Sequence, residues 1–301
     1  MAWSGVFPAV TTKLKPDGRF DAGAMAHSIE RLVDNGVSGL IVLPMLGENA
    51  SLSQKERDEV LDLSVSTVAG RVPLLSGLAA VSTADAASMA KNCQQRNLNG
   101  LMVFPSLAYK TDRRETVAWY KAVAAASDLP IMIYNNPIAY KVDVDVPTLE
   151  GLRDVDTVTC IKEETGDIRR VTDLYNAFDN RFAVFCGVDD LILESLALGV
   201  TGWVSGMTNA WPRECVEIFN AGRAGKFDAI RPLYQLMTPA FHLDTDVKLV
   251  QYIKLAENIV YGAPAGVRAP RLELEGEELA RVTAVIEKTV SDLAAYQPGT
   301  N

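Results

Sequence analysis

One lysine and one tyrosine in this 301-residue chain occupy positions where side chains can carry out carbonyl chemistry. Lys162 follows a mostly apolar run, 155–161, and should close a buried strand, where an ammonium is costly to desolvate. An amine in such a place has a lowered pKa and can attack a carbonyl or imine carbon, forming a Schiff base that acts as an electron sink. The alternative is a lysine that pairs with Glu163 or Glu164 at a solvated rim.

Tyr134 lies near the end of the preceding apolar run, 129–136. If the two runs form neighbouring strands about 5 Å apart, the Tyr134 hydroxyl can reach a substrate held on Lys162 and shuttle protons. A buried tyrosine that is hydrogen-bonded only to backbone is the alternative. An imine on lysine supplies its own electrophile, so this chemistry requires no cofactor and no metal.

Eight short apolar runs recur at intervals of about 20–35 residues, a spacing typical of repeated βα units. They span residues 5–12, 39–44, 72–77, 100–105, 129–136, 157–162, 182–187 and 201–206. Because the runs are apolar on both faces and alternate with helical patterns, they predict an α/β fold, a closed parallel (β/α)8 TIM barrel. A doubly wound sheet is the runner-up, but no G-x-G-x-x-G follows the first run and residues 220–227 lack the leading glycine of a P-loop.

The helices between these runs have recognisable ends. One is expected to begin near Asp21 and stop at Gly36, and Ser53 with Glu56 forms a capping box that opens another. After residue 210 the strand pattern stops and helical periodicity follows. We therefore expect a catalytic barrel over 1–210 and a C-terminal helical appendage over 211–301. The appendage stripes are short and Pro239 interrupts one, which favours packing on the barrel or on another subunit over a coiled coil.

The composition excludes several classes of protein. A net charge of −9 and a pI near 4.9 leave no basic surface for nucleic acid. No apolar run is long enough to span a bilayer, and the N-terminal segment carries no secretion signal, so a cytoplasmic enzyme for small molecules is expected. The four cysteines are far apart in the sequence and are expected to be buried, reduced thiols.

The histidines and the clustered carboxylates are weaker candidates for a metal or catalytic site. The two histidines, His27 and His242, form no H-x-x-x-H or E-x-x-H pair, so a metal site built on imidazole is not expected. His27 should face solvent, and His242 should be structural or lie at a subunit contact. Asp189 and Asp190 could bind a cation, but N-capping of a helix explains one of them more simply.

Four segments carry a family resemblance. They are IMIYNNP (131–137), CIKEETGDIRR (160–170), LGENASLSQKER (46–57) and GWVSGMTNAWP (202–212). Together they look like the dihydrodipicolinate synthase and N-acetylneuraminate lyase superfamily of Schiff-base aldolases, and the match covers essentially the whole chain. The resemblance implies that Lys162 is the Schiff-base residue and that Tyr134 donates and accepts protons. It also implies a homo-oligomer, a tetramer.

The chain departs from the family pattern at the groups expected to hold a substrate carboxylate. The G-[ST]-T-G-E loop of the family reads Pro44-Met45-Leu46-Gly47-Glu48 here, without either hydroxyl. The paired tyrosines after the fourth strand are replaced by residues 105–107, and Ala139 stands where synthases have an arginine. Lysine biosynthesis is therefore not expected.

The substrate-binding candidates follow from the same segments. The backbone N–H groups of Leu46 and Gly47 are expected to hold the carboxylate, with Val204 as the opposing apolar wall. Gly187 and Asp189 resemble the part of the lyase site that meets a substrate hydroxyl. Their neighbours Glu48 and Ser205 complete the set.

The segments LGENxSL, YNNPxAYKV, CGVDD and GWVSGMTNAWP are most similar to the Δ1-pyrroline-4-hydroxy-2-carboxylate deaminase branch. This resemblance implies a keto acid or cyclic imino acid substrate and a role in hydroxyproline breakdown. Three alternatives stay open: a 2-keto-3-deoxy sugar acid dehydratase, a pyruvate-dependent aldolase, and a non-catalytic sensor that binds a keto acid.

Overall fold

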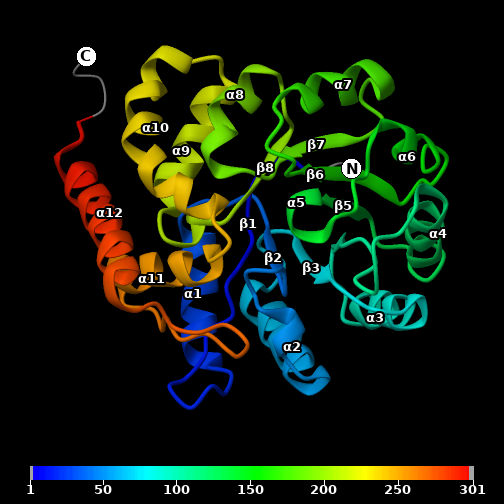
Figure 1. Cartoon of the computed structure of the whole chain (residues 1–301), viewed down its shortest axis with the longest axis horizontal. Helices are drawn as coiled ribbons and strands as arrows, with labels where there is room; N and C mark the ends of the chain where they lie inside the picture. Colours follow the sequence, from blue (N-terminus) through cyan, green and yellow to red (C-terminus); the bar gives the residue numbers. More distant parts are fainter. Residues whose placement is uncertain (1–2, 298–301) are drawn as a thin grey trace.

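Eight parallel strands form the centre of the protein, as a computed structural model that describes residues 3–297 shows (Figure 1). The strands are β1 (Gly5–Pro8), β2 (Leu40–Val42), β3 (Leu74–Leu78), β4 (Gly100–Val103), β5 (Ile131–Asn135), β6 (Val158–Glu163), β7 (Ala183–Cys186) and β8 (Gly202–Ser205). Their order is β1-β8-β7-β6-β5-β4-β3-β2. The circle closes between β1 and β2, where Ala9 bridges Ile41 and the Val10 amide donates to the Ile41 carbonyl at 2.9 Å. The predicted (β/α)8 barrel is confirmed.

The strands are buried on both faces because helices cover the outside and side chains fill the inside. Inside, the rings of Phe7 and Phe185 meet edge to face, with centroids 5.6 Å apart. A Cβ on Gly202 would lie 2.1 Å from the Phe185 ring, so the missing side chain on β8 makes room for that ring. Aromatic rings therefore fill this part of the barrel interior.

Helices alternate with the strands around the barrel. They are α1 (Ala22–Asp34), α2 (Gln54–Val68), α3 (Thr83–Gln95), α4 (Arg113–Ala124), α5 (Pro137–Tyr140), α6 (Val146–Glu150), α7 (Arg169–Phe178), α8 (Ile192–Ala197) and α9 (Pro212–Arg223). Short 3-10 helices are η1 (Asn49–Ser51), η2 (Asp189–Leu191), η3 (Met207–Asn209) and η4 (His242–Thr245). Asp21 caps α1 by accepting from the Ala24 amide, and Ser53 and Glu56 form the expected capping box on α2.

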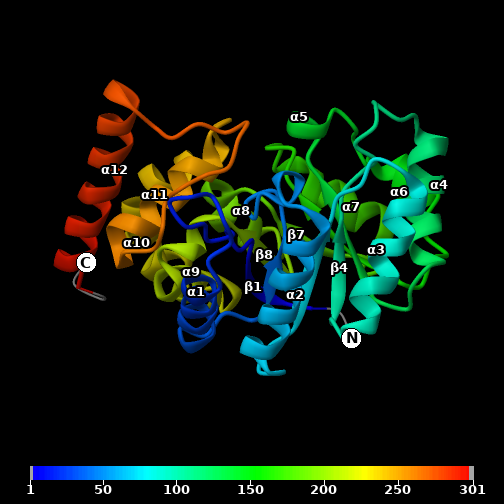
Figure 2. The ribbon, with the colours of Figure 1, turned by 90° about the horizontal axis from the view of Figure 1, so that it is seen from below.

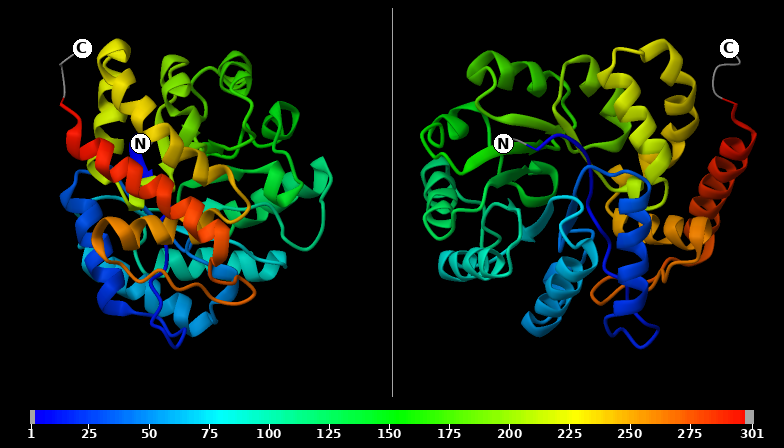
Figure 3. Two further views of the ribbon diagram at one scale, coloured as in Figure 1. Left: turned by 60° about the vertical axis from the view of Figure 1, so that its left-hand side comes forward. Right: turned by 180° about the vertical axis from the view of Figure 1, so that it is seen from behind.

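Three helices extend the chain beyond the eighth βα unit: α10 (Phe227–Phe241), α11 (Leu249–Tyr261) and α12 (Gly276–Ala295). They lie together on one side of the barrel, and α12 crosses the outer faces of α10 and α11 (Figure 3). The expected break at Pro239 is wrong, because α10 continues through Pro232 and Pro239 to Phe241. Buried side chains on both sides of Pro239, at Met237 and Ala240, hold the helix in place despite the missing amide donor.

Two buried ion pairs join α11 to the loops at the barrel mouth. Lys254 Nζ lies 2.5 Å from Glu48 Oε1, and neither side chain is exposed. One helical turn away, Glu257 accepts from Lys13 and from the Thr11 hydroxyl. These contacts fix the loop after β1 and the loop after β2 against the same face of one helix.

Other expectations concern residues away from the mouth. Cys93, Cys160, Cys186 and Cys215 are buried and free, as predicted. His27 is exposed on α1. Within residues 3–297, no helix is both long enough and apolar enough to cross a membrane.

Candidate active site

Lys162 and Tyr134 lie side by side at the barrel mouth. They are direct register partners on β6 and β5, and Lys162 Nζ lies 4.3 Å from the centre of the Tyr134 ring. Figure 2 shows the barrel from the side, with α5, which follows β5, at the mouth end and the N-terminus at the opposite end. Both side chains line one narrow recess, so each can touch a molecule bound there.

Tyr134 is held by aromatic rings and by one amide. Its ring meets Phe104 and Tyr140 edge to face, at centroid distances of 4.8 and 5.7 Å. Asn136 Nδ2 donates to the Tyr134 hydroxyl oxygen at 3.0 Å. Burial, and then the negative charge of Glu164, raise the pKa of Tyr134 well above its ordinary value. The phenol therefore keeps its proton at neutral pH.

Lys162 is paired with a carboxylate, but at a buried position and not at a solvated rim. Its Nζ lies 2.5 Å from Glu164 Oε2, and only 8% of the lysine side chain is exposed. Glu164 Oε1 accepts from Asn136 Nδ2 at 2.9 Å, so Lys162, Glu164, Asn136 and Tyr134 form one connected group. Gly187 completes this arrangement, since a Cβ there would lie 2.9 Å from Lys162 Cε.

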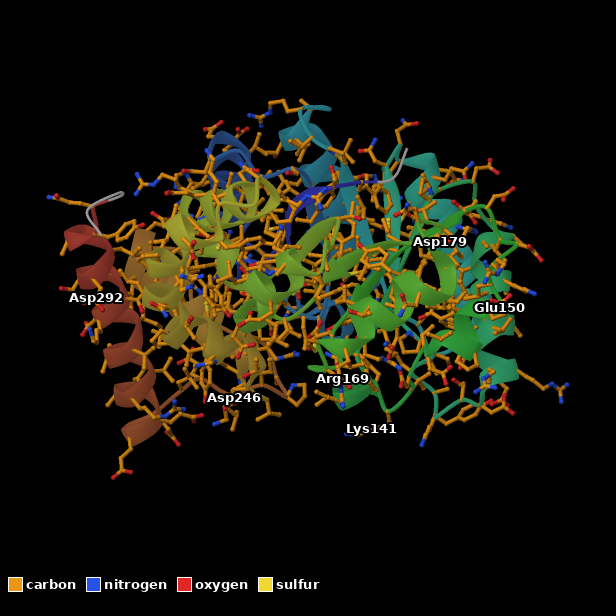
Figure 4. All side chains as sticks on the ribbon, turned by 90° about the horizontal axis from the view of Figure 1, so that it is seen from above. Lys141, Glu150, Arg169, Asp179, Asp246 and Asp292 are labelled. Atoms are coloured by element: carbon orange, nitrogen blue, oxygen red, sulfur yellow. The ribbon has the colours of Figure 1, made fainter. Side chains whose placement is uncertain are left out.

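The recess opens into a larger cavity of about 710 Å³ at the mouth. Met45, Glu164 and Asp244 line both spaces, which makes them one continuous site. Figure 4 places Lys141, Arg169 and Asp246 along the mouth edge of the molecule. Lys141 and Arg169 are exposed there, and their charged groups contact the Ile138 carbonyl and Asp167.

The loop after β2 reaches the recess differently from our expectation. Met45 and Leu46 line it. Gly47 was expected to offer its amide to a carboxylate, but that amide donates to the Pro44 carbonyl at 3.1 Å and closes a turn. Glu48 turns away from the recess into its ion pair with Lys254. Within the part of the chain that the structure describes, the Met45 and Leu46 amides have no hydrogen-bond acceptor.

The candidates on β7 and β8 separate into two groups. Gly187 lines the cavity. Asp189 instead lies behind β8, where its carboxylate accepts from Trp203 Nε1 at 2.9 Å and from the Met207 amide at 2.7 Å. It positions the end of β8, and the next residue, Asp190, lines the cavity. Ser205 is also turned outward and accepts from the Thr208 amide at 3.0 Å.

Burial raises the pKa of Asp189 to about 7, although the Met207 amide and other donors counteract part of that effect. On the interior side of β8, Val204 is buried within the barrel and Gly206 lines the recess. The strand therefore presents a glycine, rather than the expected valine, to the recess.

Three polar residues were not predicted from the sequence to belong to the site: Glu164, which was considered only as a rim partner of Lys162, Asn136 and Asp244. The first two could have been found, because each lies two residues after a predicted catalytic residue, and side chains two apart on a strand share a face. Asp244 belongs to η4 in the appendage, and no strand periodicity points to it. Its position depends on how the appendage packs.

The histidines and carboxylates form no metal centre in the described part of the chain, where no group of three or more His, Cys, Asp or Glu side chains could hold an ion. His242 lies in the appendage, as expected, and its Nδ1 is 2.7 Å from Asp190 Oδ2. His242 therefore engages Asp190, while the Met207 amide and the Trp203 indole engage Asp189.

Comparisons with known proteins agree with this geometry. A family model described as the dihydrodipicolinate synthetase family matches residues 2–289. The 4-hydroxy-tetrahydrodipicolinate synthase of Methanothrix thermoacetophila is 30% identical over 293 residues, covering 96% of this chain and 97% of that protein.

Solved structures give the same result. The 4-hydroxy-tetrahydrodipicolinate synthase of Methylacidiphilum fumariolicum superposes with a TM-score of 0.92 at 26% identity, covering 97% of both chains. A dihydrodipicolinate synthase of Bacillus anthracis superposes with a TM-score of 0.91 at 26% identity, covering 95% of this chain and 98% of that one.

Proposed function

The chain belongs to the dihydrodipicolinate synthetase family of Schiff-base lyases, and from this premise we propose that it deaminates Δ1-pyrroline-4-hydroxy-2-carboxylate. The products are 2-oxoglutarate semialdehyde and ammonia. The observation that carries the proposal is the register pairing of Lys162 with Tyr134 at the recess. The loop that lines this recess has lost both hydroxyls of the family pattern.

The first step is attack of Lys162 Nζ on the ring C=N carbon, which opens the ring by transimination. Glu164, 2.5 Å from Nζ, is placed to accept the lysine proton. The substrate ketone carbon then stays on Lys162, and the imine withdraws electrons from the neighbouring carbon. Tyr134 moves protons while the 4-hydroxyl leaves from the resulting enamine. Water then releases ammonia at the far end of the chain and frees the product from lysine.

The substrate carboxylate needs donors, because an unpaired buried charge costs several kcal/mol. Met45 and Leu46 line the recess, and their amides have no acceptor among the described residues. They therefore replace the expected pair of Leu46 and Gly47. The Met45 and Leu46 side chains give the recess apolar walls, which suit a compact ring.

The relatives are named as synthases, and three features argue against that reaction in this chain. Ala139 stands where synthases carry an arginine, residues 105–107 replace the paired tyrosines of the family, and the loop hydroxyls are missing. Carboxylates line the larger cavity, which disfavours a second anionic substrate there.

The decisive experiment is an assay of product release from the hydroxypyrroline carboxylate. Ammonia release supports the proposal. Water loss from a sugar acid without nitrogen release would identify a dehydratase, and pyruvate formed by carbon–carbon cleavage would identify an aldolase. Borohydride added during turnover should attach the substrate skeleton to Lys162, and Lys162→Ala should abolish both labelling and turnover. Binding of pyruvate without any reducible adduct would establish the sensor alternative.

A further inference from the structure

Asp244 is the one carboxylate of the appendage that reaches the chemical recess in the described structure. It belongs to η4 and lines both the recess, with Lys162 and Tyr134, and the larger cavity. A Cβ on Gly206 would lie 2.2 Å from Asp244 Oδ1, so the glycine at the end of β8 makes room for this carboxyl group. Asp244 therefore reaches the recess from the C-terminal appendage and not from one of the eight βα units.

The Asp244 side chain is also without a side-chain partner. Asp244 is 9% exposed, and its carboxyl group accepts from the Asp189 backbone amide, but no side chain of residues 3–297 donates a hydrogen bond to it. By contrast, Asp189 accepts from Trp203, and Asp190 is engaged by His242. A buried polar group that borders a cavity without such a partner indicates a ligand that supplies one.

The surrounding charges indicate the chemistry of that ligand. Among the described residues, those that line the larger cavity include Glu164, Asp190, Asp244 and Asp246 but no lysine, arginine or histidine. The cation nearest to the reaction is Lys162, which lines the inner recess and is consumed as the Schiff base. A substrate end that carries hydrogen-bond donors or a positive charge fits this wall, and a second carboxylate does not.

Burial raises the pKa of Asp244 well above its ordinary value, and the negative charges of Asp189 and Glu164 act in the same direction, against the positive charge of Lys162. These effects favour the protonated form of the Asp244 carboxyl group in the resting protein. It can give up that proton when a basic nitrogen is formed beside it.

We propose that Asp244 is a catalytic acid that protonates the ring nitrogen of the cyclic imine as the ring opens, and then binds the resulting primary amine. This inference rests on the proposed function, because only a cyclic imine brings such a nitrogen to the site. It assigns to the appendage a direct part in substrate selection, with nitrogen preferred over a simple hydroxyl at that end of the substrate.

The step balances in atoms and charge. Lys162 Nζ forms a bond to the imine carbon, and both bonds of the C=N double bond between that carbon and the ring nitrogen break in turn, with their two electron pairs going to nitrogen. The nitrogen gains two protons, one from Lys162 and one from Asp244. The products are a protonated Schiff base on Lys162, a primary amine at the end of the open chain and an Asp244 carboxylate. That carboxylate and the amine can then share a proton as an ion pair.

The test compares Asp244→Asn with the unaltered enzyme on two ligands. Pyruvate has no nitrogen, so borohydride should trap it on Lys162 equally in both proteins. With the hydroxypyrroline carboxylate, we expect Asp244→Asn to form the trapped adduct and release ammonia at least about 100-fold more slowly, the loss typical of a removed general acid. Asp228→Asn is the matched control, since Asp228 is an exposed aspartate of the same appendage that pairs with Arg231 on α10 and lines neither space; it should react within about twofold of the unaltered enzyme.

Each contrary result has a distinct meaning. If Asp244→Asn slows pyruvate trapping as much as it slows reaction of the imine, Asp244 acts only by positioning Lys162. That result overturns the inference. Imine turnover within about threefold of the unaltered rate would overturn it as well. If the unaltered enzyme releases no ammonia from the imine, the proposed function itself fails, and this is seen before any variant is made.

Discussion

At the scale of single residues, the site depends on where side chains are missing as much as on where they are present. Gly187 and Gly206 border the reacting groups, and each leaves the space that a polar side chain fills, Lys162 Cε in one case and Asp244 Oδ1 in the other. Lys162 is therefore positioned by the strand on its far side as well as by its own strand.

Gly187→Ala should disable the lysine without altering any polar group. The new methyl group would meet Lys162 Cε, Glu164 Cβ and the Glu163 carbonyl, all within 2.9 Å. We expect borohydride trapping of pyruvate to slow by at least about tenfold, because a misplaced nucleophile loses its attack geometry. Gly23→Ala, on α1 with no close neighbour except Asp21 at 3.6 Å, is the control. Equal trapping rates in the two variants would contradict this account.

The loop after β2 allows a second test. Leu46→Thr restores one family hydroxyl but leaves the backbone amide in place, so turnover should stay within roughly tenfold, about 1.4 kcal/mol. Gly47→Val should be far more damaging, because its Cβ would lie 2.9 Å from Pro44 Cδ and 3.1 Å from Leu43 Cα. The measurement is KM and kcat for both variants. A bound carboxylate paired with Lys141 or Lys110 would disprove the amide site.

The sequence predicted that Lys162 and Tyr134 are neighbours, because both residues close apolar strands and strand order in a barrel places those strands side by side. It failed at Glu48 and Asp189, whose carboxylates point away from the recess. In each case the residue type was informative, but the direction of the side chain depended on partners more than 10 residues away, Lys254 and Trp203. Asp244 was missed for the same reason, since only the packing of the appendage brings it to the mouth.

At the scale of elements, α11 holds the mouth together. Its Lys254 and Glu257 reach loops that follow β1 and β2, and the Arg268 amide adds a hydrogen bond to Glu48 Oε2 at 2.9 Å. The pKa values of Lys13 and Lys254 are lowered. Burial is the main cause, and the carboxylates of Glu257 and Glu48 offset only part of it. The loop that lines the recess is thus fixed from outside the barrel.

Lys254→Met should destabilise the protein and weaken substrate binding together. Removal of one partner leaves the buried Glu48 charge without its main compensation, which typically costs about 3 kcal/mol or more. The urea unfolding midpoint should fall and KM should rise, because the loop with Met45 and Leu46 loses its anchor. The double variant Lys254→Met/Glu48→Gln should recover much of the lost stability. No difference between single and double variants would show that the pair is not coupled.

At the scale of the whole molecule, the raised pKa of Asp189 affects how the free energy of unfolding changes with pH. Its folded value of about 7 exceeds the ordinary 3.8, so between these pH values the folded state keeps a proton that the unfolded state has released. Stability from this group is full below about pH 4 and is lost as pH rises to about 7, at up to about 1.4 kcal/mol per pH unit. Asp189→Asn should flatten that slope in urea unfolding from pH 4 to 7. Parallel slopes would contradict it.

Assembly is the remaining prediction at this scale. We propose a homotetramer on the family likeness, and exposed apolar side chains such as Val247 at 93% and Leu272 at 77% agree with further burial. Light scattering at micromolar concentration should give four times the 32.6 kDa of one chain. A monomeric mass would remove the proposal.

The link between Glu48 and Arg268 has a consequence for synthesis on the ribosome. The loop after β2 is made early, yet the groups that neutralise its buried carboxylate belong to residues made more than 200 positions later. β1 likewise waits for β8 before its ladder can form. In a nascent chain, β1 and the Glu48 carboxylate must therefore stay in contact with water until nearly all of the protein has emerged. The catalytic mouth becomes complete only when the appendage arrives.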